Sequence, residues 1–335
     1  MDVLNTFGLT KDTDLQHFYN KNMLSDGARK LVHEVFAKMC EDMPQKKGDY
    51  CKWHRYAVPT AATAEIVEAV NPDPTTVTRT EVTAQIKQYG AYTAYSDKVD
   101  LMDVDPTLTS LGRVMGTHGQ VSMDAVARDI FQGGTSVYYA NNVAGRSSII
   151  TELSNDDLDA IDRAMQNDRA EYLTEITSAS QNYGTESVDE AFYVIGHTDL
   201  KKDLPGLTGW IPRKDYADPK VAHPFEVGAV GNFRFVLTPE AKIHADGGGS
   251  AVTNTLKFTT ANTACDVYPL LIVGKDAIGK VPLSGKGFEN VNKDLGSAGA
   301  ADPLSLYGTV GWKSLMAYVI LNESWLYRYE IGVSR

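Results

Sequence analysis

The chain has 335 residues, of which 43% are hydrophobic and 22% charged, values typical of a globular protein with a sizeable core. Its net charge is −11 and no basic stripe is visible, which argues against a strong nucleic-acid binder. The sequence contains neither a membrane-length apolar run nor a signal-peptide pattern, so we expect a soluble protein made in the cytosol. Cys40, Cys51 and Cys265 lack paired spacing, which argues against a disulfide framework.

The N-terminal segment carries one helical pattern. Leu31, Val35 and Met39 recur every four residues alongside Val32 and Phe36, which predicts a helix over about residues 27–43 that ends before Pro44. One helix is too short to bury a core of its own. We therefore expect it to pack on the rest of the chain or on a neighbour.

Residues 51–104 are predicted to be extended, because their second half is rich in Thr, Val and Tyr. Val82, Ala84 and Ile86 alternate with polar residues, so one face of the strand is apolar. Gly90 interrupts the pattern, as at a bulge or bend. An isolated ribbon is marginally stable in water, so this segment also needs a partner surface.

A long helix is predicted from Asp105 to Gln132, between the extended first third and a mixed α/β remainder. Its apolar or small face comprises Leu108, Leu111, Met115, His118, Ser122 and Ala125. Gly112, Gly116 and Gly119 each cost a helix about 1 kcal/mol relative to Ala. They predict either a kinked or split helix or a place where another backbone crosses closely.

The remainder is predicted to alternate helix and strand. Ser154 and the carboxylates after it cap a second helix. The buried face of this helix is predicted to comprise Leu158, Ile161, Met165, Tyr172 and Ile176. Strands are predicted at residues 192–197, 233–237, 267–273, 315–321 and 325–331. The loop Asp246–Ser250 is predicted to be an exposed tip.

No motif for a cofactor or a metal is complete. Residues 279–287 have one residue too many between their glycines for a phosphate-binding loop, and Gly287 stands where Ser or Thr must hold magnesium. Cys51 and His54 lack the second pair that a zinc site needs. Helix capping accounts for the acidic residues after Ser154. We therefore expect no cofactor and no metal.

Two histidines are candidates for chemistry. His197 lies at a strand end near Asp199, but no Ser or Cys nucleophile motif accompanies it, which favours a hydrogen-bonded structural role. His118 lies on the apolar face of the long helix and is interpreted as a core residue. The sequence therefore indicates no active site.

The order of these parts resembles that of the major capsid proteins of tailed bacteriophages, specifically the podovirus-type family that also occurs in prophages. Four stretches carry the resemblance: residues 88–99, SMDAVARDIF at 122–131, FEVGAVGNFRFVLTPEAKI at 225–243 and GWKSLMAYVILNESWLYRYEIG at 311–332. Together with their spacing they cover most of the chain from about residue 80 onward.

The resemblance implies an α+β protein with the tailed-phage major capsid fold, also called the Johnson fold. Residues 1–50 would form an N-terminal arm and 51–104 an extended β loop. Residues 105–184 would hold the spine helix and a helix of the peripheral domain, 185–304 the axial domain, and 305–335 the C-terminal strands of the peripheral domain.

In this fold the arm and the extended loop lie across neighbouring subunits. The loop residues expected at such contacts are Val82, Ile86, Tyr89, Gly90, Tyr92 and Tyr95. The residues expected to pack the spine helix are Leu108, Leu111, Gly112, Met115 and Gly116.

The function that this resemblance implies is structural. Pentamers and hexamers of the chain would assemble into an icosahedral shell, the virion capsid, which encloses phage double-stranded DNA without sequence-specific binding. The expected partners are other copies of the chain and scaffolding, portal and decoration proteins, with no membrane, in a host bacterial cytoplasm. Two alternatives are an encapsulin-like compartment shell and a cytosolic enzyme that uses His197 and Asp199.

Overall fold

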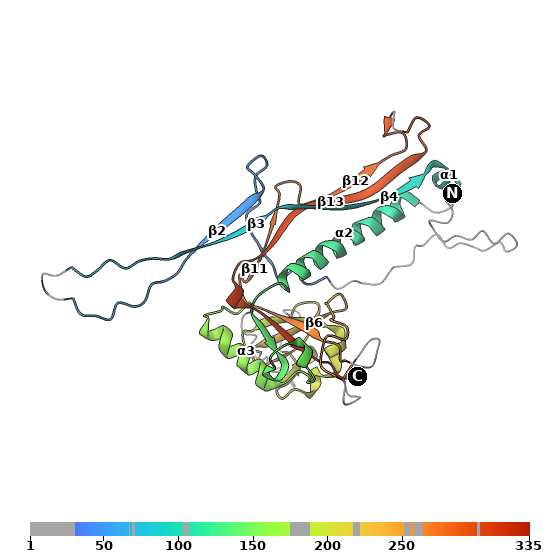
Figure 1. Cartoon of the computed structure of the whole chain (residues 1–335). Helices are drawn as coiled ribbons and strands as arrows, with labels where there is room; N and C mark the ends of the chain where they lie inside the picture. The colour runs from blue at the N-terminus through green and yellow to red at the C-terminus, as the bar shows by residue number, and fades with distance from the viewer. Residues whose placement is uncertain are drawn as a thin grey trace.

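The computed structural model describes residues 31–66, 68, 71–102, 107–174, 188–216, 222–250, 256–257, 264–299 and 302–335. These residues form two connected parts (Figure 1). One is an elongated sheet with a long helix along it, and the other is a globular part around a second sheet. A two-stranded ribbon extends away from both.

The elongated sheet is organised around β13 (Tyr307–Ile320). One edge of β13 pairs antiparallel with β4 (Lys87–Ser96). The other edge pairs antiparallel with β12 (Phe288–Lys293) and then with β11 (Ile278–Pro282). The short strand β1 (Lys38–Met39) adds parallel to β11. A short helix, α1 (Asp97–Met102), follows β4 at the far end of this sheet (Figure 1).

Helix α2 (Thr107–Phe131) is continuous and lies along one face of the elongated sheet (Figure 1). The long helix was therefore predicted correctly, and the split that the glycines left open as one alternative does not occur. The helix residues that reach the second hydrophobic core are Met115, Met123, Val126, Ala127, Ile130 and Phe131. Gly119 is buried against the stacked rings of Phe288 and Trp312, whose centroids lie 5.8 Å apart.

The buried face of α2 differs from the predicted one. His118 is exposed, whereas Gly119 and Met123 are buried, so the contact stripe recurs every four residues through Met115 and Phe131. A Cβ at Gly119 would come within 3 Å of both rings, so glycine is what lets the sheet approach the helix. The glycines predicted to pack, 112 and 116, face open space. Leu111 is half-buried, and the side chain of Leu108 lies outside the described residues.

The globular part is built on a seven-stranded mixed sheet with helix α3 (Asn155–Asn167). In spatial order its strands are β5 (Val137–Tyr139), β14 (Leu326–Ile331), β10 (Tyr268–Val273), β6 (Phe192–His197), β9 (Phe233–Thr238), β8 (Glu226–Val230) and β7 (Trp210–Pro212). Ser154 caps α3 by accepting the N–H of Asp157, as predicted. Three α3 side chains, Leu158, Ile161 and Met165, share one core with this sheet.

Short 3₁₀ helices connect these elements at Ala140–Asn142, Arg146–Ser148, Thr198–Lys202, Leu204–Gly206, Arg213–Asp215 and Glu323–Trp325. The strands predicted at 192–197, 233–237 and 267–273 are confirmed within a residue. Ile176, predicted to extend α3, lies outside the described residues, and the helix ends before Tyr172.

The predicted grouping of the C-terminal half needs a correction. Residues 305–335 do not form one unit, because β13 belongs to the elongated sheet and β14 to the seven-stranded sheet. The strands β11 and β12, predicted in the axial domain, pair with β13. The apolar pattern of a strand predicts that the strand is buried but not which other strand it pairs with. The sequence therefore could not assign these strands to one sheet or the other.

The predicted helix at 27–43 is wrong over its described residues. Residues 31–45, here called the strap, form a turn and then β1 along the edge of β11. Val32, Phe36 and Ala37 are buried in the second core, whereas Val35 and Met39 of the predicted stripe are exposed. Tertiary packing has overridden the helical pattern here.

We predict that Phe131→Ala destabilises the chain by about 3–5 kcal/mol. Phe131 is 1% exposed and meets the Tyr318 ring edge-on at 6.0 Å, so its loss leaves a cavity between α2 and β13. Val114→Ala is the matched control, because Val114 lies on the same helix and is 47% exposed. Denaturant unfolding measures both. A cost for Phe131→Ala no larger than that of the control would contradict the described packing.

Candidate functional site

The most exposed feature of the chain is the ribbon, defined here as residues 50–85. Its strands β2 (Tyr50–Tyr56) and β3 (Arg79–Gln85) pair antiparallel, and every described residue from 54 to 81 is exposed. Large apolar side chains on it are more than half exposed, namely Tyr56, Val58, Ile66 and Val77. A segment with this much uncovered apolar surface is typical of a protein–protein contact.

Only part of the predicted extended loop belongs to this ribbon. The structure places β4 in the body of the chain, where Tyr95 is 5% exposed and Tyr89 packs against the second core. Ile86 packs against the small core at the ribbon's root, and Val82 pairs with Trp53 across the ribbon. These side chains are therefore engaged within their own chain. The alternating pattern predicted a strand correctly but could not show that its partner is β13.

Gly90 and Tyr92 instead line an open groove of about 830 Å³. The groove lies on the sheet face opposite α2, because residues 88, 90 and 92 alternate with 89 and 91, which pack with α2 in the second core. Tyr92 is 75% exposed. The other residues that line the groove are Val291, Lys293, Ser297, Ala298, Asp302, Tyr307, Thr309, Gly311 and Lys313, together with Gln88, Tyr89, Ala91 and Trp312.

Two glycines, Gly90 and Gly311, line the floor of the groove. Gly90 pairs with Lys313 without a register shift, so the predicted bulge is absent. A Cβ at Gly90 would lie 2.9 Å from the Trp312 carbonyl oxygen, and one at Gly311 would lie 2.8 Å from the Ala91 carbonyl oxygen. The close pairing of β4 with β13 therefore requires glycine at both positions. The backbone is left uncovered by side chains at these two points of the groove.

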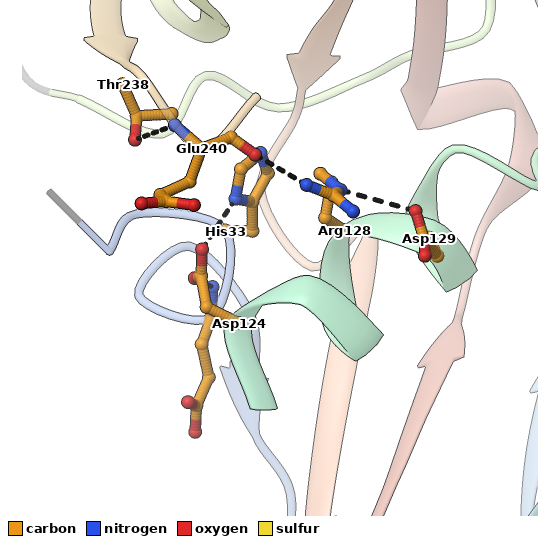
Figure 2. A network of polar contacts seen from close by, with 7 residues as sticks. His33, Asp124, Arg128, Asp129, Thr238 and Glu240 are labelled. Carbon is orange, nitrogen blue, oxygen red and sulfur yellow. Dashed lines mark hydrogen bonds and ion pairs between the residues drawn. The ribbon is translucent and has the colours of Figure 1, made fainter. Parts of the chain in front are cut away.

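A buried polar network fastens the strap to α2 (Figure 2). The Nδ1 atom of His33 lies 2.8 Å from Oδ2 of Asp124, and both side chains are at most 2% exposed. The other carboxylate oxygen of Asp124 accepts the backbone N–H of Glu34 at 3.1 Å. The carboxylate of Glu34 in turn lies 3.2 Å from Nζ of Lys280 on β11. The strap is thus fixed to both the helix and the sheet.

The same end of α2 is fastened to the globular part. Arg128 donates from Nη1 to the carbonyl oxygen of Glu240 at 2.6 Å, and its Nε donates to Asp129 at 3.2 Å (Figure 2). Asp129 also pairs with Lys242 at 3.3 Å. These contacts join the helix to the segment after β9, so the two parts of the chain are tied together near the strap.

We predict that His33→Ala loosens the strap. The change leaves one oxygen of the buried Asp124 carboxylate without its partner, which costs about 1–3 kcal/mol. Limited proteolysis should cleave residues 31–45 faster than in the parent chain. His54→Ala, a change at a 41% exposed side chain on the ribbon, is the control. Equal cleavage of the strap in both variants would show that the His33–Asp124 contact does not hold it.

A second buried charge lies in the seven-stranded sheet. The Glu330 carboxylate has no exposed surface and accepts two hydrogen bonds from Arg146, at 2.6 and 2.7 Å. Arg328 adds a contact of 2.9 Å. Burial alone would raise the pKa of Glu330, but the hydrogen bonds and charge of Arg146, with Arg328 and His244, hold the pKa below its ordinary 4.5.

We predict that Glu330→Gln destabilises the chain by about 3 kcal/mol near neutral pH, because it leaves Arg146 facing an uncharged group. A carboxyl whose folded pKa is lowered contributes stability above its unfolded pKa and loses it as pH falls through the folded pKa. The gap in unfolding free energy between parent and variant should therefore shrink below about pH 4.5. A gap that stays constant or widens on acidification would contradict this assignment.

The histidine proposed as an alternative catalytic residue has a structural role. The Nδ1 atom of His197 accepts the backbone N–H of Asp199 at 3.1 Å and so caps the 3₁₀ helix that follows β6. Burial lowers the pKa of His197, chiefly by desolvation. The Asp199 carboxylate accepts from Tyr268 at 2.9 Å and pairs with Lys257 at 2.7 Å. The other candidate, His118, accepts the indole N–H of Trp312 at 3.0 Å.

Within the described ranges, no group of three His, Cys, Asp or Glu side chains is arranged to hold a metal ion. Across the same part of the chain, no helix has the length and apolar character needed to cross a membrane.

Comparison with known proteins shows which fold the chain has. The chain is 24% identical over 261 residues to the major capsid protein of Pseudomonas phage KPP21. The aligned segment covers 72% of this chain and 65% of that protein. The capsid of Ralstonia phage GP4 superposes with a TM-score of 0.69 at 10% identity, over 98% of both chains. The chain has the tailed-phage major capsid fold. No family model matches the sequence.

Two further structures show the same fold. The cyanophage Pam1 capsid gives a TM-score of 0.64 at 12% identity over 98% of this chain and 99% of that one. The head of Helicobacter pylori bacteriophage KHP40 gives 0.63 at 9% identity over 96% of both. The α+β fold inferred from the sequence resemblance is thus confirmed. The matched segment spans just under two thirds of the KPP21 protein, at 65% of its length.

Proposed function

We propose that this protein is the major capsid protein of a tailed bacteriophage, a structural protein and not an enzyme. The observation that carries the proposal is the capsid fold over nearly the whole chain, shared with the GP4 capsid. The similarity to the KPP21 major capsid protein supports the same function. These relatives are phage capsids, which favours a virion shell over an encapsulin-like compartment.

We infer that the ribbon of one subunit lies on the groove of the next. Each chain carries an open groove and a ribbon whose described residues from 54 to 81 are exposed, so neither of these surfaces is covered by the described residues of its own chain. Contacts between two different surfaces of identical subunits are heterologous, so they form closed rings when the rotation between subunits closes. Pentamers and hexamers of an icosahedral shell are rings of this kind.

The charges of the groove and of the distal part of the ribbon are complementary. Residues 57–78, beyond Lys52, Arg55 and Arg79 at the root, contain Glu65, Glu68 and Asp73 and no Lys or Arg. The groove presents Lys293 and Lys313, with Asp302 as its acidic residue. Opposite charges at the edge of an interface guide docking and suppress wrong pairings more than they add affinity. The apolar contacts with Tyr92 and Val291 then supply the burial.

The remaining partners follow from the proposed function. A shell of this kind encloses double-stranded DNA without reading its sequence, and a net charge of −11 suits weak contact with phosphates. Scaffolding, portal and decoration proteins are proposed as further partners. Synthesis in a bacterial cytoplasm precedes incorporation into the virion.

We predict that Lys293→Glu with Lys313→Glu prevents assembly of the shell. Each exposed pair contributes only about 0.5–1 kcal/mol, but like charges then face each other at every copy of the contact. Negative-stain microscopy should show particles for the parent chain and only monomers or small rings for the variant. Adding Glu65→Lys and Glu68→Lys to the same chain should restore particles, because each chain supplies both surfaces.

Lys201→Glu with Lys214→Glu is the control for net charge, since both lysines are exposed on the globular part. This variant should still form particles. Loss of assembly in the control, or no rescue by the fourfold variant, would contradict the docking of ribbon on groove. A parent chain that never forms particles under any assembly condition would contradict the capsid function itself.

A further inference from the structure

Two cysteines, Cys40 and Cys51, lie at the root of the ribbon and pack on the same small core. Cys40 directly follows β1, and its backbone N–H donates to the Lys280 carbonyl oxygen at 3.0 Å, which places it beside β11. Cys51 is the second residue of β2 and pairs with Ala84 on β3. Both cysteines are free and half-buried.

Both thiols pack on the same small core. Met43, Ala84, Val281 and Ala317 form this core, and Cys40 and Cys51 are among the half-buried residues packed against it. Burial is the main cause that raises the pKa of Cys40; Lys38 lowers it, and the nearby Cys51 raises it. Ten intervening residues, 41–50, join the two cysteines along the chain.

We propose that Cys40 and Cys51 form a disulfide site, oxidised by a small-molecule disulfide such as oxidised glutathione. The resulting bond would join the strap covalently to the root of the ribbon. This proposal does not depend on the capsid function, because it concerns two thiols of one chain.

The exchange proceeds in two balanced steps. One cysteine thiolate attacks a sulfur of oxidised glutathione, forms a mixed disulfide and releases one glutathione thiolate. The second cysteine thiolate then attacks the protein sulfur of that mixed disulfide and releases the second glutathione. Two protein thiols are oxidised to a disulfide and one glutathione disulfide is reduced to two thiols, because the two released glutathione thiolates take up the two protons that the protein thiols lose.

The bond would fix the direction in which the ribbon leaves the body. The ribbon meets the rest of its chain chiefly through the core that holds the two cysteines, and residues 54–81 beyond it are exposed. The connecting turn has positive φ at Lys46 and Gly48, 65° and 96°. A covalent link across this turn removes the freedom of the ribbon to pivot about its root.

The third cysteine is the internal control. Cys265 is buried, and its thiol donates to the Ile149 carbonyl oxygen at 2.9 Å in the globular part. Burial raises its pKa as well. Cys265 is not among the residues of the small core on which Cys40 and Cys51 pack, so the native chain should leave it reduced.

The test treats the native full-length chain with oxidised glutathione, blocks residual thiols with iodoacetamide and maps peptides by mass spectrometry. We expect one linked peptide pair joining Cys40 to Cys51, also formed in Cys265→Ser and absent in Cys40→Ser. The rate should rise about tenfold from pH 7 to pH 8, because the thiolate is the attacking species and both pKa values are raised.

Three results would overturn the proposal. The first is separate glutathione adducts on Cys40 and Cys51 with no linked pair in the native chain. The second is a bond between two chains, which a non-reducing gel shows as a dimer. The third is a linked pair that forms in the urea-unfolded chain but not in the native one, since the fold would then hold the thiols apart.

Discussion

The packing of α2 on β13 is the interaction on which the rest of the structure depends. It requires a glycine at position 119, because the stacked rings of Phe288 and Trp312 occupy the space where a side chain would be. From this contact the helix runs to Phe131, where Arg128 reaches the globular part and Asp124 holds the strap. The elongated sheet, the strap and the globular part are therefore all positioned relative to one helix.

This packing leaves the two faces of the elongated sheet unequally covered. One face of the elongated sheet is covered by α2, and the other is open over Gly90 and Gly311. The ribbon extends beyond the body with its apolar side chains exposed (Figure 1). A monomer built this way buries its core well but leaves two complementary surfaces uncovered. We regard this combination as the physical basis of the proposed assembly, because each surface lacks the apolar cover that a second copy could provide.

Local patterns in the sequence predicted secondary-structure elements well, but they predicted poorly which segments those elements pack against. The apolar strand at Phe192–His197 and the helix cap at Ser154 depend on residues that are close in the sequence, and both were predicted correctly. The strap was not, because His33 bonds to Asp124, 91 residues away, and no local pattern reports such a contact. Tyr95 alternates as an exposed ribbon residue would, yet β13 covers it. Val32 and Phe36 were assigned to the apolar face of the predicted helix and are buried, whereas Val35 and Met39 of the same face are exposed, so the sequence showed apolar residues but not the conformation that buries them.

The central claim is that the ribbon of one subunit covers the open sheet face of another. A cryo-electron microscopy reconstruction of particles assembled from the purified chain tests it directly. Ribbon density between Tyr56 and Val77 should lie on the neighbouring subunit's groove, over Gly90 and Gly311, with Tyr92 buried. A reconstruction in which this groove is open to solvent, or is filled by a different segment, would contradict the account.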